Sequence, residues 1–311
     1  MAFFSVIIPV YNKQNFVYNT IQSVLSQTFS DFEIIIINDG STDESEKEIL
    51  KFSDKRINYF KQKNSGLSAS RNKGIKIASS KYLTFLDSDD IWHPGYLEKI
   101  IYLINSFPSE KIFATNYYDF YPNGIKLLPK NLALQFKEDA IITNYFSQNL
   151  GQPFYIASCL CVEKSVFETI GYFNEKITYA EDVDFNIRSN LKFNTVFTNK
   201  PYIDYYVFSE NQITTTGLKD KTIPDFSFYK KNNINNKELN VYLDFNLYTI
   251  AKMYKMDSDF KNFKKIYVQI DLKNLNFKQK CLLKMPRFLL LILKIIARLF
   301  IKFGIRFSSY G

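Results

Sequence analysis

Three carboxylates lie within four positions in the stretch TFLDSDDIWHPG at residues 84–95. Asp87, Asp89 and Asp90 follow an apolar run that predicts a buried strand, so their charges repel one another at its end. Hard divalent cations such as Mg²⁺ or Mn²⁺ take oxygen ligands, commonly one or two carboxylates together with substrate phosphates. A bound cation would therefore cancel the repulsion. The alternative is an ordinary acidic turn in which Asp90 only precedes the helix expected after Pro94.

Other candidate residues follow the first two predicted strands. The strand FSVIIPV ends in Pro9 and Val10 before Tyr11, and the strand FEIIIIN is followed by Asp39. The carboxyl ends of parallel strands meet at one edge of a sheet, where doubly wound folds bind their ligands. An aspartate there can accept hydrogen bonds from a ribose or a base. Taken alone, however, the Asp39-Gly40 pair is an ordinary turn signal.

Apolar strands alternate with helical stretches along the first 120 residues. This pattern predicts an α/β fold with a Rossmann-like, mostly parallel sheet that is covered by helices on both faces. Strands are expected at 4–10, 32–38, 56–62 (a more polar edge strand), 82–87, 111–121 and 195–208, with a further strand and a helix within 155–175. Helices are expected at 15–27, from about Thr42 after an N-cap at Ser41, at 66–80, 94–102 and 180–191, and in the Lys/Asn-rich part after 217. Residues 121–152 are expected to be irregular with a short helix.

Composition narrows the classes of function. The 311 residues are 46% hydrophobic and have a net charge of +9, which indicates an anionic partner. Three cysteines form no metal-ligand pattern and favour a reduced, cytosolic compartment. The chain has neither a G-x-G-x-x-G nor a P-loop motif, which disfavours a dinucleotide cofactor and a P-loop enzyme. The single histidine, His93, lies at a helix start, where a structural role is at least as well supported as catalysis.

Five motifs together resemble glycosyltransferase family 2. They are SVIIPVYN at 5–12, IINDGSTDES at 36–45, GLSASRNKGI at 66–75, FLDSDD at 85–90, and GYFNE with AEDVDFNIRS at 171–189. The resemblance spans about residues 4–210 and implies the GT-A fold, a nucleotide-diphosphate sugar donor and a Mn²⁺ or Mg²⁺ cofactor. Longer relatives have a later histidine or a Q-x-x-R-W motif. Neither occurs after residue 93, which argues against a processive synthase and leaves the third side of the metal site open.

The resemblance also assigns roles to single positions. The general base would be Asp182, supported by Glu181, although an acidic pair at a helix N-terminus is also favoured by the helix dipole alone. The metal would be bound by Asp89, with Asp87 beside it. Arg71 would lie near the phosphates, the alternative being an exposed helix arginine. The nucleotide would contact Pro9, Val10, Tyr11, Asp39, Arg71, Asp87 and Ser88.

The C-terminal stretch KMPRFLLLILKIIARLFIKFGIRF at 284–307 predicts an amphipathic helix. After Lys284, its basic residues, at 287, 294, 298, 302 and 306, cover a stripe of about 120° at ~100° per residue. No uncharged stretch approaches the ~20 residues that span a bilayer. A helix lying on an anionic membrane surface fits this pattern, and packing on the catalytic domain or in a homodimer is the alternative. Nucleic acid would leave the apolar arc unexplained and is not expected as a partner.

These observations predict a domain at 1–217, a helical extension at 218–283 and a membrane-associating helix at 284–311. The expected activity is inverting, metal-dependent transfer of a sugar from a nucleotide-diphosphate donor, expected to be UDP-linked, to a hydroxyl group of a glycan or lipid-linked acceptor. The expected process is surface polysaccharide assembly. The expected location is the cytoplasmic side of the cell membrane, as a peripheral protein. The alternatives are a sugar nucleotidyltransferase and a non-catalytic membrane scaffold that binds nucleotide sugars.

Overall fold

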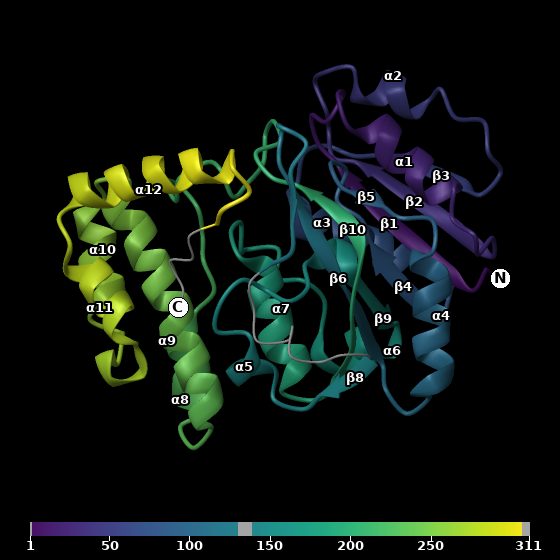
Figure 1. The fold of residues 1–311 in the computed structure, drawn as a ribbon. Helices are drawn as coiled ribbons and strands as arrows, with labels where there is room; N and C mark the ends of the chain where they lie inside the picture. The colour runs from purple at the N-terminus through teal and green to yellow at the C-terminus, as the bar shows by residue number, and fades with distance from the viewer. Residues whose placement is uncertain (1, 130–138, 307–311) are drawn as a thin grey trace.

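The computed structural model describes residues 2–129 and 139–306, and its described strands form one ten-stranded mixed sheet. The strand order is β3-β2-β1-β4-β9-β6-β10-β5, with β7 paired to β6 and β8 paired to β10 (Figure 1). The strands are β1 (Phe4–Val10), β2 (Phe32–Asn38), β3 (Ile57–Lys61), β4 (Tyr82–Phe85), β5 (Ile91–Trp92), β6 (Ile112–Phe120), β7 (Lys126–Leu127), β8 (Asp139–Ile142), β9 (Leu160–Glu163) and β10 (Thr195–Tyr206).

The direction of the strands decides which residues meet. Strands β1, β2, β3 and β4 are parallel to one another, whereas β9 lies antiparallel between β4 and β6. Strand β10 is parallel to β6. Two antiparallel pairings in succession restore the original direction, so β1, β2, β4, β6 and β10 all end at the same edge of the sheet. The predicted α/β fold with a mostly parallel sheet is confirmed, and the polar strand β3 lies at its edge as expected.

Helices flank the sheet and also form a group of their own after it. Figure 1 shows α8 to α12, in green and yellow, gathered beside the sheet-containing part. The helices are α1 (Val17–Leu25), α2 (Ser45–Ile49), α3 (Leu67–Ile77), α4 (Tyr96–Ser106), α5 (Tyr145–Gln148), α6 (Ser165–Ile170), α7 (Glu181–Asn190), α8 (Phe226–Asn232), α9 (Lys237–Met256), α10 (Phe260–Tyr267), α11 (Phe277–Lys284) and α12 (Arg287–Ile301), with 3₁₀ turns η2 (Ala157–Cys159) and η3 (Leu272–Asn274).

Two helix predictions need correction. The N-cap expected at Ser41 is wrong because α2 starts only at Ser45, and the Ser41 hydroxyl instead accepts a hydrogen bond from the backbone N–H of Asn12. The C-terminal helix expected over 284–307 is shorter, since α12 ends at Ile301 and the chain then turns at Gly304 with a positive φ of 72°. Residues 130–138 of the irregular segment and 307–311 of the tail lie outside the described residues.

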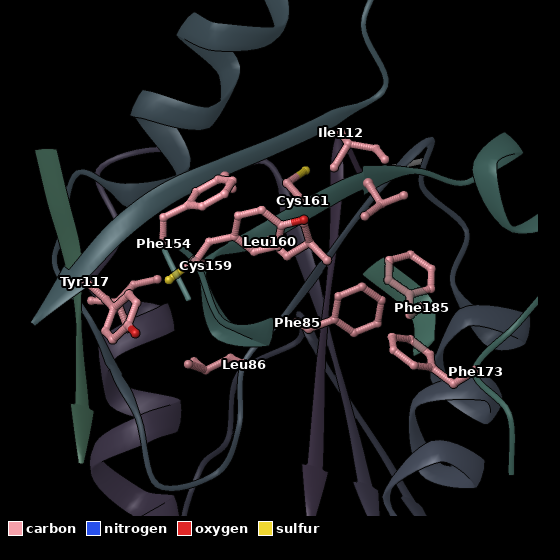
Figure 2. Close-up of a cluster of buried hydrophobic side chains, with 14 of the residues drawn as sticks. Phe85, Leu86, Ile112, Tyr117, Phe154, Cys159, Leu160, Cys161, Phe173 and Phe185 are labelled. Carbon is pink, nitrogen blue, oxygen red and sulfur yellow. The ribbon is translucent and has the colours of Figure 1, made fainter. Parts of the chain in front are cut away.

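The core beneath this edge of the sheet contains aromatic and sulfur-containing side chains. Figure 2 shows Phe85, Phe173 and Phe185 close together, with centroid distances of 5.7 Å from Phe85 to Phe173 and 4.8 Å from Phe173 to Phe185. Cys159 and Cys161 are free thiols in the same buried layer. Burial raises the pKa of both thiols, so these cysteines act as small apolar side chains. This packing fixes β4 and α7 relative to each other.

Candidate functional site

Asp39, directly after β2, organises the loop that leads into α3. Its carboxylate accepts hydrogen bonds from the backbone N–H groups of Ser65 (2.9 Å) and Gly66 (2.8 Å) and from the Gln62 amide (2.7 Å). The next residue, Gly40, has φ +74°, and a Cβ there would lie 2.8 Å from the Asn64 nitrogen. Only glycine fits such a crowded left-handed position. The loop is therefore held against the end of β2 by Asp39 and by the absence of a side chain at Gly40.

Arg71, on α3, joins two of the predicted site carboxylates. Its side chain is 1% exposed and donates to Glu181 Oε1 and to Asp87 Oδ1, each at 2.8 Å. Its guanidinium also lies 5.4 Å from the centre of the Phe173 ring. Arg71 is therefore not the exposed helix arginine considered as an alternative. It is a buried cation that holds the start of α7 against the end of β4.

Asp182 lies next to this ion-pair network, in the first turn of α7. Its Oδ1 accepts a hydrogen bond from the N–H of Val183. Burial and then the neighbouring Glu181 charge raise the pKa of Asp182 to about 6, although Arg71 pulls it down. A carboxyl group with such a pKa is ionised at neutral pH and can still take up a proton readily. The residue that precedes α7, Ala180, has a left-handed φ of +62°, a strained conformation for a residue with a Cβ.

The acidic cluster that follows β4 is neutralised by cations of the protein itself. Asp87 pairs with Arg71, and Asp89 Oδ2 accepts a hydrogen bond from Lys13 Nζ at 2.7 Å. Lys13 also donates to the Ser209 hydroxyl (3.3 Å) and the Glu210 carbonyl (2.6 Å), and Ser209 in turn donates to Asp89. The Lys13 side chain is buried. The repulsion inferred from the sequence is thus offset at Asp87 and at Asp89 by one buried cation each.

Asp90 differs from its two acidic neighbours because it is completely buried. It accepts a hydrogen bond from the Ser158 hydroxyl at 2.5 Å and from the N–H of Tyr206 at 3.2 Å. Burial, followed by the charges of Asp89 and Asp87, raises its pKa well above the usual value for an aspartate. This residue ties the segment after β4 to η2 and β10, so it has a structural role.

The remaining predicted positions lie at the same edge with different exposure. Pro9 and Val10 are the last residues of β1 and are buried, and the Val10 carbonyl accepts a hydrogen bond from the N–H of Asp39 at 2.8 Å. Tyr11 is 43% exposed, whereas Ser88 is buried. Of these four, Tyr11 presents the most side-chain surface to a ligand.

His93 lies on the far side of β10 in an ion-pair group of its own. Its Nε2 is 3.0 Å from Asp204 Oδ1, and Lys126 Nζ is 2.6 Å from the other oxygen of the same carboxylate. These contacts give His93 a structural partner, in line with the structural role preferred from the sequence.

The acidic residues can be tested as ligands for a metal ion. Among the described residues, no group of three or more His, Cys, Asp or Glu side chains is arranged to hold a metal ion. Both hydrogen bonds to Asp89 reach Oδ2, and Asp87 is partly exposed. Hard cations use one or two carboxylates together with substrate phosphates. The residues present therefore fit a cation shared with a bound diphosphate.

The sequence reasoning missed Lys13, Ser209 and Asp119. Lys13 comes two residues after Tyr11, and Ser209 and Asp119 lie at the ends of β10 and β6, at the same edge as the acidic cluster. The position of Ser209 three residues after β10 is a signal of the same kind as those after β1, β2 and β4, whereas Asp119 lies within β6 and Lys13 lies three residues beyond the end of β1. The sequence alone does not place β6 and β10 in the sheet.

Helix α12 packs on α9 and leaves a row of apolar side chains exposed. Leu290 is its buried residue, whereas Phe288, Ile292 and Ile295 are exposed. Arg298 lies 5.0 Å from the centre of the Phe208 ring, across a cavity of about 360 Å³ lined by Phe208, Ser209, Thr215, Arg298 and Ile301. The helix therefore reaches the candidate site at its C-terminal end.

None of the helices in residues 2–129 and 139–306 has the length and hydrophobicity needed to cross a membrane.

Comparison with known sequences identifies relatives of this chain. Residues 5–171 match the family described as glycosyl transferase family 2. A Rickettsia bellii protein named "Uncharacterized glycosyltransferase" is 40% identical over 177 residues, which are 56% of this chain and 23% of that protein. The Escherichia coli protein named UDP-Glc:alpha-D-GlcNAc-diphosphoundecaprenol beta-1,3-glucosyltransferase WfaP is 39% identical over 142 residues, 42% of this chain and 54% of WfaP. The chain thus spans about a quarter of one relative and about half of the other.

Solved structures agree with the fold. The S. aureus TarS fragment 1–349 in complex with UDP has a TM-score of 0.58 and 19% sequence identity, covering 89% of this chain and 77% of that one. The same fragment in complex with UDP-GlcNAc gives a TM-score of 0.59 at 18% identity, covering 90% and 78%. At this level of identity the comparison supports the architecture.

Proposed function

Because the chain belongs to glycosyl transferase family 2, we propose that it transfers a sugar from a UDP-linked donor to a hydroxyl group of a glycan or lipid-linked acceptor, with inversion at the anomeric carbon. One observation supports this most: Asp39, the acidic cluster after β4 and the Glu181-Asp182 pair meet at one edge of the sheet, and Arg71 links the last two. The TarS complexes contain UDP and UDP-GlcNAc, and the name of WfaP specifies a UDP-Glc donor and a diphosphoundecaprenol-linked acceptor.

Asp182 is proposed as the general base. An acceptor hydroxyl that attacks the anomeric carbon must lose its proton, and a carboxylate beside it can take that proton. The pKa of about 6 keeps Asp182 ionised at neutral pH. Glu181 is fixed by Arg71 and supports this geometry from the preceding position. The two neighbouring carboxylates therefore have different tasks, one to take the proton and one to hold the helix in place.

The donor is proposed to bind at the ends of β1, β2 and β4. The nucleotide would lie along Tyr11 and Asp39, with Asp87 and Asp89 beside its diphosphate. A Mg²⁺ or Mn²⁺ ion held by Asp89, with Asp87, would stabilise the negative charge that gathers on the leaving diphosphate. Lys13 adds a positive charge at the same place, 2.7 Å from Asp89 Oδ2.

The amphipathic segment 284–307 is proposed to dock the protein on the cytoplasmic face of the membrane, where a lipid-linked acceptor would be found. Nine large apolar side chains of this segment that follow Arg287 are at least 39% exposed, namely Phe288, Ile292, Leu293, Ile295, Ile296, Leu299, Phe300, Phe303 and Ile305. Exposed apolar surface of this kind on an otherwise folded protein marks an interaction site. Lys294 and Lys302 lie exposed on the same segment and suit anionic headgroups. The proposed role in surface polysaccharide assembly follows from docking at the membrane together with the proposed lipid-linked acceptor.

The donor can be identified by a screen of nucleotide sugars for thermal stabilisation with and without Mn²⁺ or Mg²⁺. A ligand at about 100 times its Kd stabilises the folded state by ~2.7 kcal/mol. Asp89→Asn is expected to lose the metal-dependent part of the shift, and Asp182→Asn to keep the shift but lose transfer. Asp259→Asn, at the N-cap of α10, is the matched control and should behave as wild type. Wild-type transfer by Asp182→Asn would exclude Asp182 as the base.

A further inference from the structure

A buried ion pair joins the C-terminal segment to the catalytic edge of the sheet. Arg306 donates to Asp119 Oδ2 on β6, 187 residues away in the chain. The two side chains are 9% and 6% exposed. Arg306 also donates to the Gln152 side-chain oxygen (2.6 Å) and to the Tyr121 hydroxyl (2.5 Å), and its guanidinium lies 5.6 Å from the centre of the Tyr121 ring.

The groups around Arg306 are those that commonly recognise sugars. A carboxylate accepts hydrogen bonds, an amide both accepts and donates, and a phenol offers a hydroxyl together with an aromatic face. The Gln152 amide already donates to Asp119 at 3.2 Å, so these two side chains are held together. In this structure the N–H groups of the Arg306 guanidinium donate to the oxygen atoms of these three side chains. The hydroxyl groups of a sugar can donate to the same oxygen atoms.

Asp119, Tyr121 and Gln152 form a cluster around Arg306, and Asp119 lies at the same edge of the sheet as the acidic residues of the proposed donor site. Asp119 is paired in register with Tyr205, and the N–H of the following residue, Tyr206, donates to Asp90. Burial raises the pKa of Tyr205 well above its usual value, and the charges of Asp90, Asp89 and Asp119 add to the effect. Asp119 therefore lies on the strand next to β10, and its register partner Tyr205 directly precedes the residue whose N–H binds Asp90.

A short connection joins Arg306 to the end of α12. Only three residues separate Arg306 from Lys302, the C-cap of α12, and Gly304 between them adopts a left-handed conformation in open space. A buried ion pair gains little net free energy, because the desolvation of both charges offsets their attraction. Burial still raises the pKa of Asp119 in the presence of Arg306. When Arg306 leaves, the carboxyl group needs other hydrogen-bond donors, which a bound sugar can supply.

We propose that Asp119, Tyr121 and Gln152 form a subsite for the hydroxyl groups of the sugar acceptor, and that Arg306 occupies this subsite until segment 284–306 is drawn to an anionic membrane surface. The inference rests on the proposed glycosyltransferase function and on membrane docking of the segment. It adds a site for the acceptor and a reason for the protein to be most active where lipid-linked acceptors are present.

The test uses the full chain, the donor found in the screen and a panel of octyl glycosides as acceptors. Arg306→Gln is expected to lower the KM for the acceptor about tenfold without vesicles, because the subsite is no longer occupied from within. Vesicles of phosphatidylglycerol and phosphatidylcholine should lower the acceptor KM of the wild type and leave that of Arg306→Gln unchanged. The donor KM should stay the same in both proteins.

Arg56→Gln is the control, because Arg56 pairs with Asp54 and belongs neither to segment 284–306 nor to the subsite. It should keep the wild-type acceptor KM and its response to vesicles. Asp119→Asn is expected to raise the acceptor KM while donor hydrolysis continues, which would also show that the variant folds.

An unchanged or higher acceptor KM in Arg306→Gln, with vesicles still stimulating, would show that Arg306 is a structural clasp and overturn the proposal. An acceptor KM of the wild type that does not respond to vesicles would overturn release by the membrane. Failure of the proposed function looks different, since then neither the wild type nor any variant would turn over a nucleotide sugar.

Discussion

Removal of the Arg71 guanidinium should both destabilise the protein and move its pH dependence. Arg71→Gln leaves Glu181 and Asp87 without their shared cation, and the Arg71 side chain is fully enclosed. Breaking a buried ion pair costs ~3–5 kcal/mol. Because Asp87 is partly exposed, solvent screens its share, and the loss should lie near the lower end, at ~3 kcal/mol.

The effect on activity follows from the charge that Arg71 places near Asp182. Arg71 lowers the pKa of Asp182, so its removal should raise that pKa further above its value of about 6. The acid limb of the kcat/KM profile should therefore move to higher pH. Urea unfolding at pH 7 measures the loss of stability, and donor turnover between pH 5 and 9 measures the shift of the acid limb.

Two further variants separate the causes. Arg188→Gln removes another arginine of this region, which pairs with Asp184 on α7. It should lose stability without moving the acid limb. Arg71→Met combined with Glu181→Gln removes both members of the more buried pair and should recover part of the stability. A loss below ~1 kcal/mol in Arg71→Gln, with an unmoved acid limb, would refute the reasoning.

Three other outcomes are expected. Asp182→Asn should abolish transfer and should stabilise the protein above pH 6. The folded pKa of Asp182, about 6, lies above its unfolded value, so its contribution to stability is complete below pH ~4 and is lost as the pH rises through about 6. Equal melting temperatures of this variant and the wild type at pH 5 and at pH 8 would contradict this. Lys13→Gln should tighten Mn²⁺ binding to the nucleotide-free protein, as measured by thermal shift, because Asp89 loses its own cation; unchanged Mn²⁺ affinity would count against a metal at Asp89. Ile295→Glu should weaken flotation with anionic vesicles by about tenfold or more, since burial of such a side chain contributes ~1.5–3 kcal/mol, whereas Val268→Glu, at a position 80% exposed on the helical region, should float like the wild type.

The sequence determined the elements and the chemistry of the site. Continuous apolar runs that alternate with amphipathic stretches are local patterns, and they were sufficient to place β1, β2, β4, α3 and α7. The acidic residues after β4, Asp39 after β2 and the Glu181-Asp182 pair were likewise found because their types and order along the chain can be recognised without knowing the contacts.

The tertiary structure decided how these charges are balanced. The partners of the acidic residues lie far away in the chain: 76 residues separate Lys13 from Asp89, and 110 separate Arg71 from Glu181. The antiparallel insertion of β9 is equally invisible in the sequence, yet it brings β6 and β10, with Asp119 and Ser209, to the same edge as β4. Local patterns report on neighbours along a helix or strand, whereas charge pairing, burial and the resulting pKa values depend on distances through space that only the packed fold defines.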